Sequence, residues 1–149
     1  MFWMSRRKLR KLVDEARVQQ AIESAERMTS GEICVSVAPL VLGNVRRKAE
    51  RAFVRLGMVA TRQRNGVLFF IVPSRRTFVI LGDAGIHAQV GDEFWQRVAG
   101  IVGERFRTGE FTEGLVEGIE EVGRLLAKHF PHEGERDVNE LGNGVDFAE

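Results

Sequence analysis

The sequence predicts an α/β fold: a three-layer α/β/α sandwich around a small mixed sheet. Four segments (14–28, 44–56, 92–106 and 112–130) carry apolar residues at helical spacing, and three runs (33–37, 67–72 and 77–81) are rich in β-branched and apolar residues. The predicted order is strand, helix, second strand and hairpin strand. The connection through the helix between the first two strands is expected to be a right-handed crossover. The first two strands are therefore expected to run parallel, with the third antiparallel beside the second.

The first predicted helix begins after Asp14, whose side chain is a suitable N-cap. Its apolar stripe consists of Val18, Ala21, Ile22, Ala25 and Met28. Segment 29–31 ends the helix, and Gly31 suits a left-handed C′ position. Run 33–37 follows, and its β-branched residues predict the first strand.

The second predicted helix is capped by Asn44 and extends to Leu56. Asn65-Gly66 is a turn signal before run 67–72, which has no polar interruption. Such a run is typical of a strand that is covered on both faces. A short polar turn at 73–76 then leads into the hairpin strand.

The last two helices are expected to begin at caps Asp92 and Thr112, and Pro131 is expected to stop the second of them. The chain thus divides into a basic N-terminal extension (1–13), an α/β/α domain (14–131) and an acidic C-terminal tail (132–149). The extension carries five basic residues and no acidic ones, while the tail carries six acidic residues and one arginine. We interpret the extension as a solvated helix and the tail as flexible or wrapped over the surface.

The composition of the chain argues against membrane-spanning, exported and nucleic-acid-binding proteins. The longest apolar run, 67–72, is far shorter than the roughly 20 residues of a membrane-spanning helix, so no membrane span is expected. The basic start lacks an apolar signal core, and Cys34 is the single cysteine, which favours the reducing cytoplasm. Five basic residues at one end form no basic face, so no nucleic-acid partner is expected.

Established catalytic signatures are missing from the sequence. There is no phosphate-binding loop, no GxSxG nucleophile elbow and no CxxC or HExxH metal pattern. Cys34 lies inside a predicted strand and is interpreted as a core residue rather than a nucleophile. A binding protein is therefore predicted in preference to an enzyme.

Acidic and amide side chains flank the predicted strands at one edge of the sheet. Glu32 precedes the first strand, Asn65 precedes the second, and Asp83 follows the third. With the strand directions given above, all three lie at the same edge. Oxygen ligands there predict a site for Ca²⁺ or, less favourably, Mg²⁺. The alternative is that Glu32 and Asp83 only cap loops and backbone amides.

Taken together, seven segments resemble a TPM domain. They are Thr29-Ser30-Gly31-Glu32-Ile33, Leu56-Gly57-Met58, Arg64-Asn65-Gly66-Val67-Leu68, Gly82-Asp83-Ala84-Gly85-Ile86, Phe94-Trp95, Phe106-Arg107-Thr108-Gly109 and Gly114-Leu115-Val116-Glu117-Gly118-Ile119. The ending, Asp137-Val138-Asn139-Glu140-Leu141 with Phe147, resembles the stand-alone, membrane-free bacterial branch of this family. The resemblance implies an α/β/α sandwich and frequent binding of divalent cations, especially Ca²⁺, at acidic loops near the sheet edge. Some members in photosynthetic membranes are described as acid phosphatases or photosystem-repair factors.

Two functions follow as expectations. The first is a divalent-cation (Ca²⁺) binding and interaction module with a protein partner that the sequence does not identify. The second is a metal-dependent, acid-phosphatase-like hydrolase of phosphomonoesters, in which a bound cation would polarise a phosphoryl oxygen. A scaffolding role through the basic extension or the acidic tail is a third reading. The oligomeric state stays open at this stage.

Overall fold

The computed structural model describes residues 5–134, 141–142 and 144–147. Its strands are β1 (Glu32–Val37), β2 (Gly66–Val72), β3 (Thr77–Gly82) and β4 (Val145–Phe147). Its helices are α1 (Arg6–Leu12), α2 (Glu15–Glu26), α3 (Val45–Arg55), α4 (Ala84–His87), α5 (Asp92–Arg107) and α6 (Phe111–His129), with 3₁₀ turns η1 (Met58–Ala60) and η2 (Pro73–Arg75).

The four strands form one mixed sheet in the order β3-β2-β1-β4. β1 and β2 are parallel, with Glu32 beside Gly66, and β2 and β3 are antiparallel, with Val67 beside Gly82. The predicted directions of these three strands are confirmed. β4 pairs in parallel with β1 at the other edge, which the sequence did not predict.

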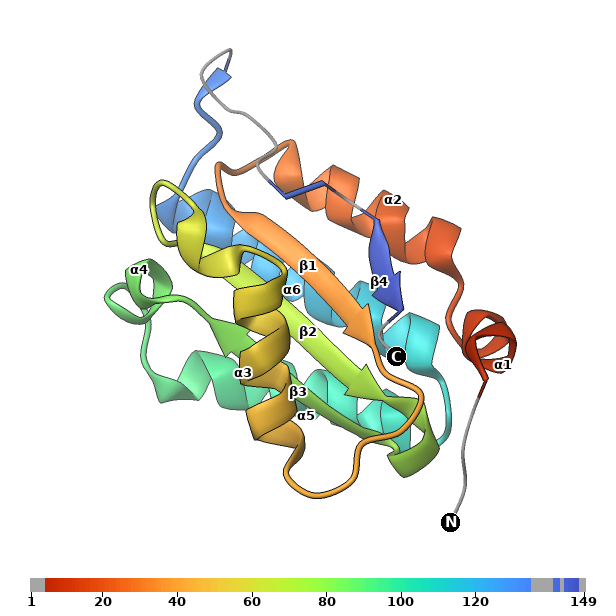
Figure 1. Ribbon diagram of the computed structural model, residues 1–149. Helices are drawn as coiled ribbons and strands as arrows, with labels where there is room; N and C mark the ends of the chain where they lie inside the picture. The colour runs from red at the N-terminus through yellow and green to blue at the C-terminus, as the bar shows by residue number, and fades with distance from the viewer. Residues whose placement is uncertain (1–4, 135–140, 143, 148–149) are drawn as a thin grey trace.

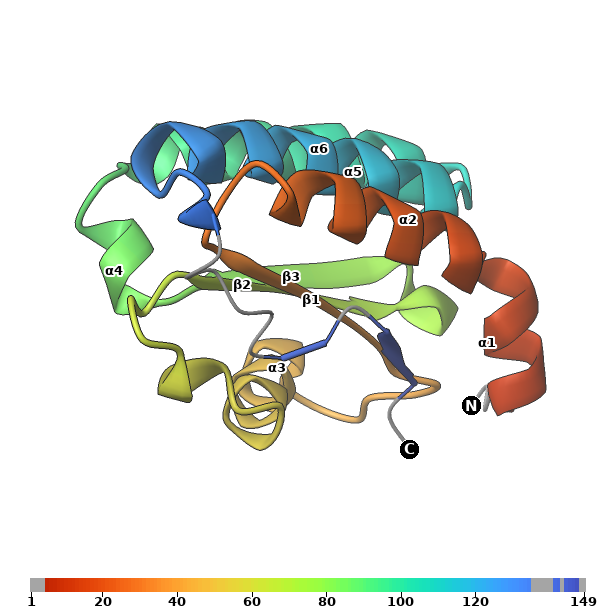
Figure 2. The same cartoon turned by 90° about the horizontal axis from the view of Figure 1, so that it is seen from above.

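Helices cover both faces of the sheet, so the predicted three-layer sandwich is confirmed (Figure 1). Seen from above, α2, α5 and α6 form one layer, while α3 and η1 lie on the opposite face (Figure 2). α1 lies beside α2, toward the edge of the sheet that carries β4 (Figure 1).

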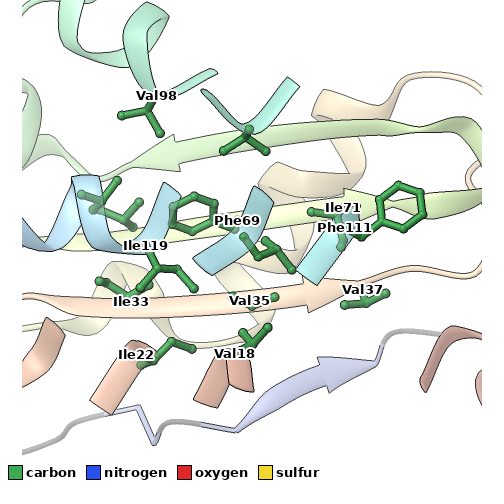
Figure 3. Close-up of a cluster of buried hydrophobic side chains, with 14 of the residues drawn as sticks. Val18, Ile22, Ile33, Val35, Val37, Phe69, Ile71, Val98, Phe111 and Ile119 are labelled. Atoms are coloured by element: carbon green, nitrogen blue, oxygen red, sulfur yellow. The ribbon is translucent and has the colours of Figure 1, made fainter. Parts of the chain in front are cut away.

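Two apolar cores lie on either side of the sheet, because successive strand residues point to opposite faces. Val67, Phe69 and Ile71 of β2 pack toward the layer of α2, α5 and α6, as the close-up of this core shows for Phe69 and Ile71 (Figure 3). Leu68, Phe70 and Val72 pack on the other side with residues of α3. All seven residues of β2 are buried, as its uninterrupted apolar run predicts.

Two of the predicted helix caps are confirmed and two are wrong. Asp14 accepts a hydrogen bond from the Arg17 amide at 3.2 Å, and Asn44 accepts one from the Arg47 amide at 3.0 Å. Asp92 is instead the first residue of α5, which follows Gly91. Thr112 lies inside α6, where its hydroxyl accepts a hydrogen bond from the Asp14 amide at 3.0 Å. The Thr112 hydroxyl therefore makes a tertiary contact with Asp14 instead of capping α6, as the local pattern had predicted.

Gly31 does not adopt the expected left-handed conformation, since it is absent from the glycines with positive φ. Helix α2 ends earlier, at Glu26. A Cβ atom at Gly31 would lie 2.9 Å from a methyl carbon of Leu126. Close packing against α6, rather than backbone conformation, therefore requires glycine here.

Both ends of the chain contribute side chains to the core. Leu9 and Val13, from the segment expected to be a solvated extension, are completely buried. Phe147, from the predicted tail, joins the same core, and the Arg10 guanidinium lies 4.4 Å from the centre of its ring. Tail residues 135–140, 143 and 148–149 lie outside the described part of the chain, so the expectations for them stay predictions. In the residues that the structure covers, no helix has both the length and the apolar character needed to cross a membrane.

Candidate functional site

The candidate site lies at one edge of the sheet, where β1 and β2 begin and β3 ends; we call this edge the rim. The Glu32 amide donates to the Asn65 carbonyl at 3.4 Å, and the Asp83 amide donates to the Gly66 carbonyl at 3.0 Å. These bonds extend the strand pairing outward by one residue. The backbones of Glu32, Asn65 and Asp83 therefore share the rim, as the strand directions require.

Asp83 is held at the rim by an arginine. Arg64 donates from Nε to Oδ2 at 2.6 Å and from Nη2 to Oδ1 at 2.7 Å, a two-pronged ion pair. Asp83 Oδ1 also accepts from the Ala84 amide at 2.8 Å and so caps α4. The hydrogen bond to Asp83, together with its charge, raises the pKa of the Arg64 guanidinium.

Arg64 has an unusual backbone conformation for a residue with a side chain. Its φ is +50°, in the left-handed region that sterics make uncommon outside glycine. Its carbonyl accepts from the Gly85 amide at 2.9 Å, and a Cβ at position 85 would lie 2.7 Å from that same oxygen. Loop 61–65 therefore packs directly on the start of α4, and Gly85 makes this close approach possible.

Asn65 is the most enclosed polar residue of the rim, at 1% exposure. Its Nδ2 donates to the Ser30 hydroxyl at 3.3 Å. Its Oδ1 is buried and has no hydrogen-bond partner among the residues that the structure describes. A buried acceptor without a partner destabilises the fold by about 1–3 kcal/mol. A ligand that bound this oxygen would remove that cost.

Glu32 is 2% exposed and begins β1. By alternation along the strand, it lies on the same face as Cys34 and Ser36, toward α3. Burial, together with the nearby carboxylates of Glu26, Glu32 and Asp146, raises the pKa of the Cys34 thiol to about 12. Cys34 lies in the core on the α3 side of the sheet, as the sequence predicts.

Further polar side chains border the rim, and sequence reasoning missed them. Gln63 Nε2 donates to the Ser30 hydroxyl at 3.1 Å and also to Glu133, which pairs with Arg62 at 2.7 Å. Ser30 thereby receives two side-chain amides, from Gln63 and Asn65. The only local signal for this cluster is its position beside the Asn65-Gly66 turn.

The three predicted ligands share the rim, but their environments differ. Asp83 is engaged by Arg64, Asn65 faces Ser30, and Glu32 lies on the α3 side of β1. Within the described chain, no group of three or more histidine, cysteine, aspartate or glutamate side chains is placed to hold a metal ion. The orphaned Asn65 oxygen fits a cation, whereas the Arg64–Asp83 pair competes with one. The ligand set therefore stays a prediction.

These features define a class of protein: an α/β/α sandwich domain with a buried polar rim where β1 and β2 begin and β3 ends. The sequence profile of the TPM domain family matches residues 11–125, and the chain belongs to this family. No match to the chain was found among curated proteins.

Solved structures agree with this assignment. The BA42 protein of the psychrophilic bacterium Bizionia argentinensis is 37% identical over 93% of this chain and 94% of that one, with a TM-score of 0.84. The N-terminal domain of a P. gingivalis protein is 19% identical over 89% of this chain and 99% of that one, with a TM-score of 0.63. The N-terminal domain of the cg2496 protein of Corynebacterium glutamicum is 15% identical over 90% and 76%, with a TM-score of 0.59. The last two likenesses concern the fold alone.

Proposed function

We propose that this chain is a divalent-cation binding and interaction module that takes Ca²⁺ at the rim. Asn65 Oδ1 and the Glu32 carboxylate would hold the ion, and Asp83 would join them once Arg64 releases it. The observation that supports the proposal is the buried Asn65 oxygen, which has no hydrogen-bond partner in the described part of the structure. A cation supplies the positive charge that both this oxygen and the buried Glu32 carboxylate favour.

The choice of ion follows from the ligands at the rim. Ca²⁺ accepts six to eight oxygen ligands at about 2.3–2.6 Å in flexible geometry, and carbonyl and carboxylate oxygens suit it equally. Mg²⁺ demands a near-octahedral shell at about 2.0–2.1 Å and gives up its waters reluctantly. The rim offers the Asn65 amide, the Glu32 carboxylate and the Asp83 carboxylate that Arg64 shares. This set favours Ca²⁺, whose remaining ligands would be water and backbone carbonyls.

Arg64 would set the affinity of this site, because its guanidinium and the ion require the same Asp83 oxygens. Binding of Ca²⁺ would turn the half-exposed Arg64 side chain into solvent. Substituting Arg64 by glutamine is thus expected to tighten Ca²⁺ binding, provided that the fold is retained.

Calorimetric titration of metal-stripped protein with Ca²⁺ tests the proposal. Binding should appear as heat and as a rise in thermal stability, by about 2.7 kcal/mol when the free ion reaches a hundred times its Kd. Asn65→Ala and Glu32→Gln should each reduce the affinity, while Asp92→Asn, which neutralises an exposed aspartate at the start of α5, should not. Absence of both heat and a melting shift at millimolar Ca²⁺ would remove the proposal.

Hydrolysis of phosphomonoesters is the second candidate, and the family profile bears the name TPM phosphatase. The observation that favours it is Arg64, a half-exposed guanidinium at the rim whose planar fork suits phosphoryl oxygens. A cation beside it would supply Lewis acidity. Purified protein should then release phosphate from a generic phosphomonoester, and EDTA and Arg64→Gln should each abolish the rate. A rate indifferent to both would indicate a contaminating enzyme.

We also propose a cytoplasmic location. Its support is the single cysteine, Cys34, which is buried and unpaired in β1 and would not require an oxidising compartment. Fractionation of cells, with detection of the chain by antibody, tests this: recovery in a membrane or secreted fraction would contradict it.

A further inference from the structure

Helix α3 gives one face of the sandwich a positive charge. It carries five basic residues and a single acidic one, Glu50. In the opposite layer, α2, α5 and α6 carry three, three and four acidic residues against one, three and two basic ones. The net charge of +1 therefore conceals a charge difference between the helices on the two faces of the sheet. Such a difference orients a protein relative to a charged surface.

The solvent side of α3 carries cations that no carboxylate neutralises. The helix buries one stripe against the sheet, which consists of Val45, Ala49, Ala52 and Phe53. Arg47, Arg51 and Val54, at positions i, i+4 and i+7, are exposed on the opposite side of the helix. Among the residues that the structure describes, Arg47, Arg51 and the exposed Lys48 form no ion pair, whereas the other two basic residues of α3 pair with carboxylates.

Exposed apolar side chains gather at the same helix. Of four large exposed hydrophobic residues in the described chain, three lie in α3 or beside its ends, and Met28 is the fourth. Leu42 precedes the helix and is 63% exposed, Val54 in its last turn is 62% exposed, and Val59 in η1 is 43% exposed. No helix covers α3 and η1 on their outer side (Figure 2). Free cations and apolar side chains are therefore interspersed on one outer surface.

We infer that this surface, the α3 face, binds reversibly to an anionic lipid bilayer. The face consists of Leu42, Arg47, Lys48, Arg51, Val54 and Val59. Basic residues beside apolar ones are typical of helices that lie in the membrane interface, where cations contact lipid phosphates and apolar side chains enter the layer beneath. The arginine and lysine stems are themselves apolar and add to this contact. The acidic helices of the opposite layer then face away from the membrane.

Two other partners fit the α3 face less well. A nucleic acid would pair with the cations, but its phosphate backbone offers no apolar contact to Leu42, Val54 or Val59. An acidic segment of another protein would meet like charges, because Glu50 and Asp92 border the hollow of about 520 Å³ beside α3. A bilayer supplies phosphates and hydrocarbon together, so it satisfies both kinds of side chain.

The contact is expected to be weak and dependent on salt. Each Lys or Arg near an anionic membrane strengthens binding about fivefold, so the three free cations should favour anionic over neutral lipid by about 100-fold. Salt screens these charges, and the chain should return to the soluble fraction when cells are broken in concentrated salt. The inference agrees with the proposed cytoplasmic location, because the cytoplasmic leaflet has a negative surface potential.

Co-sedimentation of the full chain with lipid vesicles tests the charged part of the contact. In about 50 mM NaCl the chain should sediment with vesicles of equal parts phosphatidylcholine and phosphatidylglycerol, and about 0.5 M NaCl should release it. Vesicles of phosphatidylcholine alone should leave it in the supernatant. Replacing the three free cations together, as Arg47→Gln, Lys48→Gln and Arg51→Gln, should weaken binding about 100-fold. The matched control removes the same charge from exposed arginines of the opposite layer and should change binding less than about twofold; it combines Arg17→Gln, Arg97→Gln and Arg124→Gln.

A second pair of variants tests the apolar part of the contact. Leu42→Ser combined with Val54→Ser should weaken vesicle binding at least fivefold, because these side chains lose apolar area that the bilayer would bury. Met28→Ser, at an equally exposed position after α2, should leave binding unchanged. Thermal unfolding by circular dichroism verifies that each variant is folded.

Three results would overturn the inference. The first is a chain that stays in the supernatant with phosphatidylglycerol vesicles at low salt. The second is equal weakening by the two triple variants, which would show that overall charge and not the α3 face determines binding. The third is tighter binding to a DNA duplex than to vesicles at the same phosphate concentration, without an effect of Leu42→Ser and Val54→Ser, which would assign the face to nucleic acid.

Discussion

Substituting Phe147 by alanine should destabilise the protein substantially, although this residue is the third from the end of the 149-residue sequence. Phe147 is 7% exposed and packs in the core of the α2, α5 and α6 layer, and the Arg10 guanidinium lies over its ring. Truncation of a buried phenylalanine costs about 3–5 kcal/mol, and we expect the lower end because α1 can relax toward the space. Loss of the cation–π contact at a partly exposed site adds about 0.5–1 kcal/mol.

The assay is thermal unfolding followed by circular dichroism and calorimetry. For a domain of this size 1 kcal/mol corresponds to roughly 2–4 °C, so a total loss of about 3.5–4 kcal/mol should lower the midpoint by about 7–16 °C. Leu42→Ala, at an exposed apolar position, is the control and should change the midpoint little. Arg10→Ala combined with Phe147→Ala should be less than additive, since both remove one contact. A midpoint within about 2 °C of the unmodified protein would refute the reasoning and would leave the tail free for a partner, as the scaffolding reading requires.

Three further predictions concern glycines of α5 and α6, the reactivity of the buried thiol and the pH dependence of stability. Gly118→Ala should destabilise the protein by about 1–3 kcal/mol, because a Cβ there would lie 2.7 Å from Val102 and 3.0 Å from Phe69. Gly100→Ala should stabilise it by about 0.5–1 kcal/mol, because a Cβ at that helical position would meet open space. Denaturant titration compares the two variants, and equal effects on the free energy of unfolding would contradict the packing. Cys34 should react with a thiol reagent far more slowly in the native state than in guanidinium at pH 8, and equal rates would show that it is accessible. Because the unfolded thiol ionises near its ordinary pKa of 9.0 and the folded one only near 12, stability should fall between those values, by at most about 1.4 kcal/mol per pH unit, and Cys34→Ala should remove that part of the fall.

Helical stripes and uninterrupted strands were predictable from sequence because their signals are local and repeated. The run at 67–72 is buried on both faces, and its neighbours pair with it in the expected directions. β4 was not predictable, since three residues with an aspartate in the middle carry no periodic signal. Its register depends instead on distant partners: Ser36 donates to Asp146 at 2.7 Å, and Arg55 pairs with Asp146 at 2.8 Å.

The rim was predictable in outline and not in detail. Strand direction alone places Glu32, Asn65 and Asp83 at one edge. The ion pair between Arg64 and Asp83 depends on the left-handed backbone of Arg64, which turns the side chain toward a residue 19 positions away. The spacing of apolar residues in the sequence does not predict a left-handed residue at position 64. The same is true of Ser30, whose hydroxyl gathers the amides of Gln63 and Asn65 only after β1 and β2 have paired.

A diffraction map of crystals soaked in calcium chloride tests cation binding at the rim most directly. We expect density for an ion at about 2.3–2.6 Å from Asn65 Oδ1 and from a Glu32 carboxylate oxygen, with the Arg64 guanidinium turned away from Asp83. An ordered water hydrogen-bonded to Asn65 Oδ1, with the Arg64–Asp83 pair intact and calcium elsewhere or nowhere, would contradict it.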